Sequence, residues 1–151
     1  MKNMFDLSEI NEIINRINKL KPDTQQQWGK MGVAQMLAHC NVTYEMIYDN
    51  IHKKPNPLMK LILKTLVKPA VVGEKPYKKD SKTAPQFRMK NEKQFDVEKK
   101  RLIDYILKTQ KLGEAEFHNK ESHSFGVLSK DEWSNMFYKH LDHHLKQFGC
   151  N

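Results

Sequence analysis

The C-terminal segment of the chain carries an apolar stripe at helical spacing, and two members of this stripe are histidines. Ser129 and Glu132 have the S-x-x-E spacing of a capping box, which predicts the start of a helix. Gly149 is typical of the position just beyond a helix end. Between these limits the spacing i, i+3, i+4, i+7, i+8 and i+11 predicts one face of an α-helix. The residues on this face are Trp133, Met136, Phe137, His140, Leu141, His144, Leu145 and Phe148.

His140 and His144 are separated by four residues, so both can reach a single metal ion. Residues with this separation have β-carbons roughly 5–6 Å apart on one face of a helix. Two ligands make a poor site, because zinc sites generally use three or four protein ligands. The H-E-x-x-H pattern of zinc proteases is absent, since Leu141 and Asp142 occupy the first two intervening positions. From spacing alone, a neutral, hydrogen-bonded and purely structural histidine pair is the favoured interpretation.

A second strongly helical segment supplies another histidine. It follows Trp28, has His39 at the edge of its apolar face, and has Cys40 next to it. Adjacent residues point in different directions on a helix, so a Cys–His nucleophile is not favoured and Cys40 is interpreted as core packing. The apolar face consists of Val33, Met36, Leu37, Cys40, Tyr44, Ile47 and Ile51.

Two further helices are predicted, and together the four favour an all-α four-helix bundle. The first begins near Ser8 and ends before Pro22, and the third spans Glu92 to Lys111 with Gly113 beyond its end. No strand is predicted. The long irregular connection between the second and third helices contains five prolines. It also contains a short apolar helix at Leu58 to Val67, expected to pack on the bundle mouth or on a partner subunit.

Length and composition predict a single helical domain over residues 1–151, because this length suits one core. The chain has no run of 18 apolar residues and no signal-peptide pattern, so a cytoplasmic protein with no membrane span is expected. Its two cysteines do not form a CxxC pair, which argues against a disulfide framework.

Positive charge is concentrated in one part of the chain. Residues 53–101 contain 15 Lys or Arg and 5 Asp or Glu, a net charge of +10, whereas the whole chain carries +8. Such a segment can bind phosphates, but it is more often a solvated surface. No nucleic-acid motif or aromatic platform accompanies it, so nucleic-acid binding is not expected.

The segment from Trp28 to His39, together with His140-x-x-x-His144-x-x-Gln147, resembles the DinB-like superfamily of metal-binding four-helix bundles. The residues from His123 to Trp133 and from Tyr138 to Gly149 resemble the sequence of one uncharacterised branch of this superfamily, a domain of unknown function. The resemblance implies that His39, His140 and His144 coordinate a divalent metal, nickel or zinc, with positions left open for water or substrate. It also implies a homodimer.

Four more residues are candidates to support these ligands or to line a pocket. Gln147 lies on the His140 side of its helix, and Gln35 and Thr43 flank His39 at about one turn. His123 lies in the loop before the last helix, where it is either an acid or base at a pocket rim or a partner for backbone hydrogen bonds.

The resemblance implies a metal-dependent transferase that uses small thiols, or a hydrolase, acting on a small molecule. A metal bound by three neutral imidazoles keeps its full charge and can act as a Lewis acid or lower the pKa of bound water or thiol. No general base is identified. The alternatives are a non-enzymatic helical module whose histidines bind a structural metal or none, and, more weakly, a basic protein associated with nucleic acid.

Overall fold

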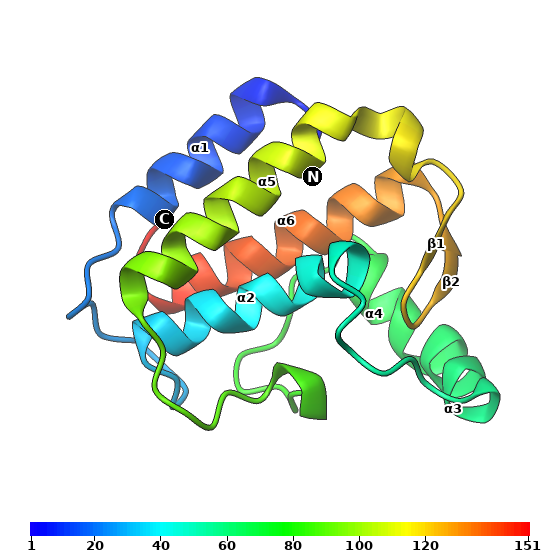
Figure 1. The fold of residues 1–151 in the computed structure, drawn as a ribbon, viewed down its shortest axis with the longest axis horizontal. Coiled ribbons are helices and arrows are strands. Elements are labelled where there is room, and N and C mark those ends of the chain that lie inside the picture. Colours follow the sequence, from blue (N-terminus) through cyan, green and yellow to red (C-terminus); the bar gives the residue numbers. More distant parts are fainter.

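Four long helices form the body of the protein (Figure 1). The computed structural model describes residues 1–151. The helices α5 and α6 each contact all the other long helices, so the predominantly helical fold expected from the sequence is confirmed. None of the helices combines the length and hydropathy that crossing a membrane requires. The long helices are α1 (Leu7–Asn18), α2 (Val33–Tyr48), α5 (Phe95–Phe117) and α6 (Lys130–Gln147).

The body is held together by one core of 22 buried apolar residues. Aromatic rings lie at its centre: the Phe137 ring is 5.2 Å from that of Tyr44, 5.6 Å from that of Trp133 and 5.7 Å from that of Phe117. Cys40 is buried beside Met36, and burial raises the pKa of its thiol. The apolar stripe of the last helix therefore faces the core as its spacing predicts.

The predicted start of α6 is also confirmed. The Ser129 hydroxyl oxygen accepts a hydrogen bond from the backbone N–H of Glu132 at 3.2 Å, and the Glu132 carboxylate accepts one from the backbone N–H of Ser129 at 2.9 Å. This reciprocal pair satisfies two backbone donors that a helix start otherwise leaves unpaired. It fixes the register of the helix that carries two of the three candidate ligands.

A small hairpin corrects the prediction that the chain contains no strand. Strands β1 (Lys120–Ser122) and β2 (Gly126–Leu128) pair antiparallel, with Ser122 opposite Gly126. Gly126 has a φ of +74°, which a residue without a β-carbon adopts easily. Each strand has three residues, which is too short for an alternating pattern to be recognised in the sequence.

The helix α5 differs from its predicted bounds at both ends. It begins at Phe95 instead of Glu92, and it continues beyond Lys111 to Phe117 across a kink at Gly113. Gly113 has φ 77° and ψ 174°, so it interrupts the helix as expected, but a further helical turn follows it.

The long connection between α2 and α5 contains the predicted short helix and more. Its residues 57–72 are helical without a break, and its second half contains a single 3₁₀ turn, η2 (Pro85–Phe87). The helical half projects at one end of the molecule in Figure 1, and we call residues 57–72 the arm. The arm consists of α3 (Pro57–Ile62), the π-helical turn η1 (Leu63–Val67) and α4 (Lys68–Val72).

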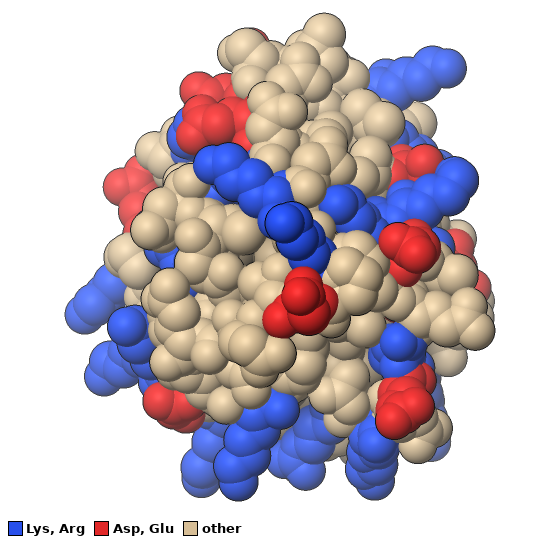
Figure 2. Space-filling model, turned by 90° about the vertical axis from the view of Figure 1, so that its left-hand side faces the viewer, with Lys and Arg blue, Asp and Glu red and all other residues tan.

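The basic balance of residues 53–101 is partly neutralised in the folded protein. Arg101 pairs with Glu45 at 2.6 Å and with Glu98 at 2.8 Å, and Lys100 pairs with Asp104 at 2.5 Å. Figure 2 shows basic side chains projecting along the lower edge of one face, with acidic side chains among the basic ones higher up. The charge is thus largely that of a mixed, solvated surface.

Candidate metal centre

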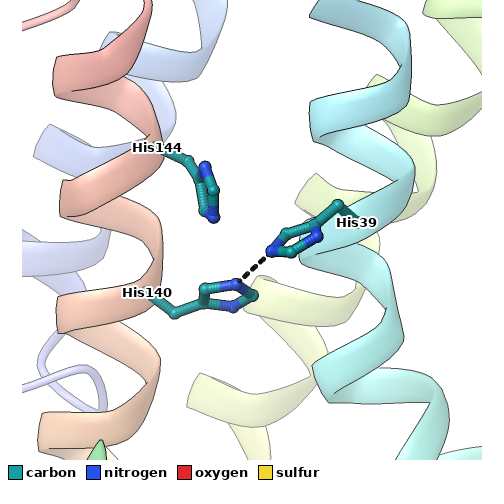
Figure 3. Close-up of side chains that lie close together, drawn as sticks. All are labelled: His39, His140 and His144. Carbon is teal, nitrogen blue, oxygen red and sulfur yellow. Dashed lines mark hydrogen bonds between the residues drawn. The ribbon is translucent and has the colours of Figure 1, made fainter. Parts of the chain in front are cut away.

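The histidines of α2 and α6 meet between these two helices (Figure 3). One ligand nitrogen from each of His39, His140 and His144 lies within 4.8 Å of the others. The Nε2 atoms of His39 and His140 are 2.9 Å apart, and the His144 ring centroid is 4.5 Å from that of His39. The structure thus brings together the three residues that the sequence predicted as ligands.

Hydrogen-bond partners fix the tautomers of the His39 and His144 rings. The Nδ1 atom of His39 is 2.8 Å from the carbonyl oxygen of Phe87, which can only accept, so Nδ1 carries the hydrogen. The Nδ1 atom of His144 is 2.8 Å from the Gln147 amide oxygen. That amide is oriented by its own nitrogen, which donates to the Trp28 carbonyl oxygen at 2.8 Å. Both histidines therefore present an unprotonated Nε2 to the space between the helices.

The third ring, that of His140, has the Thr43 hydroxyl group as its partner. Its Nδ1 atom is 3.0 Å from the Thr43 Oγ1 atom, and its Nε2 atom faces the lone pair of His39. In the metal-free state His140 therefore carries its hydrogen on Nε2, and Nδ1 accepts from the Thr43 hydroxyl. If the hydrogen moves to Nδ1, the same hydroxyl oxygen can accept it, and Nε2 becomes free to bind a cation.

The nitrogen positions fit a metal ion. Two imidazole nitrogens that are each about 2.0–2.1 Å from one ion stand roughly 3.0–3.4 Å from each other. The Nε2 atoms of His39 and His140, now 2.9 Å apart in a hydrogen bond, would reach that spacing by a small outward shift of the rings. An all-imidazole set suits zinc, nickel, copper or iron. The cluster contains no carboxylate and no thiol, so its three ligands are neutral.

Burial keeps the three imidazoles uncharged. Loss of hydration lowers the pKa of His39 and, with the nearby rings, holds that of His140 well below its usual range. Burial and the neighbouring His39 lower the pKa of His144 to about 3. Neutral imidazole is the form that binds metal, so the site does not have to release protons to solvent before it can bind an ion near neutral pH.

The 3₁₀ turn η2 covers this cluster. The Phe87 ring lies 5.2 Å from the His39 ring and 5.7 Å from the His140 ring, while its carbonyl oxygen holds His39. Nothing in the sequence singles out Phe87, because it is one aromatic residue in an irregular, proline-containing connection. Pro85, two residues before Phe87, begins the turn and is the one residue near it whose type favours a helical start.

Two of the supporting candidates lie in other contacts. The Gln35 amide oxygen accepts from the backbone N–H of Gly32 at 3.2 Å, and its nitrogen donates to the Asn91 carbonyl oxygen. This is half of a capping box, because Gly32 has no side chain to complete it. His123 contacts the Ser124 hydroxyl at 2.8 Å and donates to the His52 carbonyl oxygen at 3.1 Å. The structure brings Thr43 and Gln147 to the histidines but does not bring Gln35 or His123 there.

The metal-free protein should lose stability as the pH falls below neutrality. In the unfolded chain these histidines bind protons near a pKa of about 6.5, whereas burial keeps the folded-state pKa values lower, that of His144 at about 3. The unfolded state therefore binds more protons, and the free energy of unfolding falls by up to about 1.4 kcal/mol per pH unit for each histidine. Denaturant unfolding with a chelator present measures this slope. A constant free energy of unfolding between about pH 7.5 and about pH 5.5 would contradict it.

Comparison with known proteins identifies a family for the chain. No curated protein and no solved structure matches it. A family model described as "Protein of unknown function (DUF1569)" matches residues 1–151, and the chain therefore belongs to this family.

Proposed function

We propose that this protein binds one divalent metal ion, nickel or zinc, through His39, His140 and His144. The observation that carries the proposal is the set of oxygen atoms that face the Nδ1 atoms of the three rings. Each Nδ1 atom faces an oxygen, from Phe87, Thr43 and Gln147 respectively, while the Nε2 atoms point toward a common space. Oxygen partners that orient imidazole ligands in this way are a regular feature of protein metal sites.

The resemblance to the DinB-like superfamily extends this proposal to the whole chain. We propose that α1, α2, α5 and α6 form a DinB-like four-helix bundle and that residues 1–151 act as one domain. Support comes from the single core shared by these helices and from the placing of the histidines on the second and last of them. A homodimer is proposed on the same resemblance.

The chemistry proposed for the site is transfer of a small thiol, or hydrolysis, on a small molecule. A bound divalent ion would supply Lewis acidity and would lower the pKa of a bound water or thiol. The three neutral imidazoles would not reduce the charge at the centre, and the Phe87 ring packs against two of them, His39 and His140. The cluster itself contains no carboxylate that could act as a general base.

The enclosure of the site favours a second candidate function, a structural metal. The His39 and His144 side chains are buried, and η2 lies over His39 and His140. Structural zinc sites are closed, whereas catalytic sites keep an open position. In this second function the ion would join α2 to α6, and no substrate would reach it.

Metal content tests the site itself. After reconstitution with nickel or zinc, the wild-type chain should hold close to one ion. His39→Ala and His144→Ala should lose most of it, because two imidazoles bind too weakly. The exposed His118 provides the matched control, and His118→Ala should retain the ion. Mass spectrometry of elements on protein purified without an affinity tag gives the stoichiometry. Equal metal content in wild type and His144→Ala would refute the proposed ligand set.

The Gln147 amide should matter for affinity without being a ligand. Gln147→Leu removes the acceptor that keeps the hydrogen of His144 on Nδ1, and we expect metal affinity to fall about 10- to 100-fold. Competition with a chromophoric chelator measures the dissociation constant. Gln25→Leu, at an exposed glutamine, is the control and should bind as the wild type does. Unchanged affinity in Gln147→Leu would show that this amide does not tune the site.

Turnover separates the catalytic function from the structural one, since chelation removes the stabilisation that any bound ion supplies. In the structural case, removing the ion should lower the midpoint of thermal unfolding by several degrees, because the binding free energy is part of the folding free energy. The loaded protein should then show no turnover in assays of thiol transfer and hydrolysis. In the catalytic case, turnover should appear with the ion and be absent from His144→Ala.

A further inference from the structure

The side-chain amide of Gln147 is held between two partners. Its oxygen faces the Nδ1 atom of His144 at 2.8 Å, and its nitrogen donates to the Trp28 carbonyl oxygen at 2.8 Å. Moving the amide by more than about 0.5 Å away from either partner takes that bond out of the usual range of roughly 2.7–3.2 Å. Gln147 is also buried, being 4% exposed. The amide can therefore serve both partners only within a narrow range of positions.

Gly29, in the irregular segment before α2, borders this amide. It has a φ of +79°, and a β-carbon at this position would lie 2.6 Å from the Nε2 atom of Gln147. Such a distance is shorter than a normal contact between these atoms. Gly29 itself is exposed to solvent, so burial in the core does not explain why it lacks a side chain. The Gln147 amide occupies the space that a side chain at residue 29 would need.

The segment that contains Gly29 is held against the end of α6. The backbone N–H of Gln27 donates to the backbone carbonyl oxygen of Gln147 at 2.7 Å. The Trp28 ring lies 5.9 Å from the His143 ring, and the Lys79 ammonium group is 4.3 Å from the centroid of the Trp28 ring. Because these contacts hold the backbone on both sides of the clash, a methyl group at residue 29 would displace the free end of the Gln147 side chain.

We propose that Gly29 is a positioning residue of the metal centre, because its missing side chain leaves room for the amide that orients His144. A neutral imidazole without the Gln147 acceptor can carry its hydrogen on either nitrogen, and a hydrogen on Nε2 blocks that atom as a ligand. Partners that orient metal-binding histidines are worth about 10- to 100-fold in metal affinity. The inference rests on the ligand set proposed above and adds a residue that supplies no ligand atom.

The first test compares Gly29→Ala with Gly113→Ala, since the two glycines share a backbone conformation and differ in their surroundings. Gly113 has a φ of +77°, but a β-carbon there would meet no atom within 4 Å. Both variants carry similar backbone strain, which the midpoint of thermal unfolding measures. Only Gly29→Ala should lose affinity for zinc, by about 10- to 100-fold in competition with a chromophoric chelator. Wild-type affinity in Gly29→Ala, or an equal loss in Gly113→Ala, would overturn the inference.

A double variant tests whether Gly29 acts through Gln147. Gln147→Leu has no amide to displace, so Gly29→Ala combined with Gln147→Leu should bind zinc no more weakly than Gln147→Leu alone. Circular dichroism shows whether each variant is folded. A further loss of about tenfold or more in the double variant would mean that Gly29 acts by another route, which contradicts the positioning role.

The tautomer of His144 gives a measurement that needs no metal. Long-range ¹H–¹⁵N correlation spectra distinguish protonated from unprotonated imidazole nitrogens, and the His144 signals are those missing from His144→Ala. Wild type and Gly113→Ala should carry the hydrogen on Nδ1, whereas Gly29→Ala should also populate the form with hydrogen on Nε2. An unchanged tautomer in Gly29→Ala would overturn the inference. A changed tautomer in a protein that takes up no metal would refute the proposed function and retain the positioning role of Gly29.

Discussion

Burial of three imidazoles between α2 and α6 is the constraint that organises the structure around the site. A buried ring nitrogen that carries hydrogen must find an acceptor, since leaving it unpaired costs about 1–3 kcal/mol. For His39 and His144 the acceptors are Phe87 and Gln147, and Gln147 is itself held by the backbone of Trp28. The chain before α2 and the 3₁₀ turn before α5 are therefore fixed in place by the histidines. The carbonyl groups of Phe87 and Trp28 accept these hydrogen bonds, which helps to order the irregular segments that contain them.

The sequence predicts the parts of this site that lie on regular helices. The capping box at Ser129 sets the register of α6, and helical periodicity then places His140 and His144 on one side of it. Whether His39 would face them could not follow from periodicity, because a helical pattern gives a face and not the neighbour that the face meets. That step came from the family resemblance. The Phe87 carbonyl could not be predicted at all, since any residue at that position has the same backbone oxygen.

The arm shows a different limit of sequence patterns. The short apolar helix expected at Leu58 to Val67 is present, but the pattern alone suggested that its leucines would be covered within the chain or by a partner. The orientation depends on contacts between distant residues: Lys139 donates to the carbonyl oxygens of Ala70 and Gly73, and Lys60 and Lys68 pair with Glu121 and Glu132. The β-hairpin that supplies one of these acidic partners was missed because its strands are so short.

The helix α6 contacts the arm on one side and carries two histidines of the metal site on another. Lys139 and His140 are adjacent in sequence, yet adjacent residues on a helix diverge by about 100°. Lys139 consequently holds the carbonyl groups at the end of the arm, whereas His140 faces His39 across the metal site. The helix α6 is capped at its start and packed along its apolar face, so one ordered element positions both groups. The end of the arm and the metal site therefore lie on different sides of one helix.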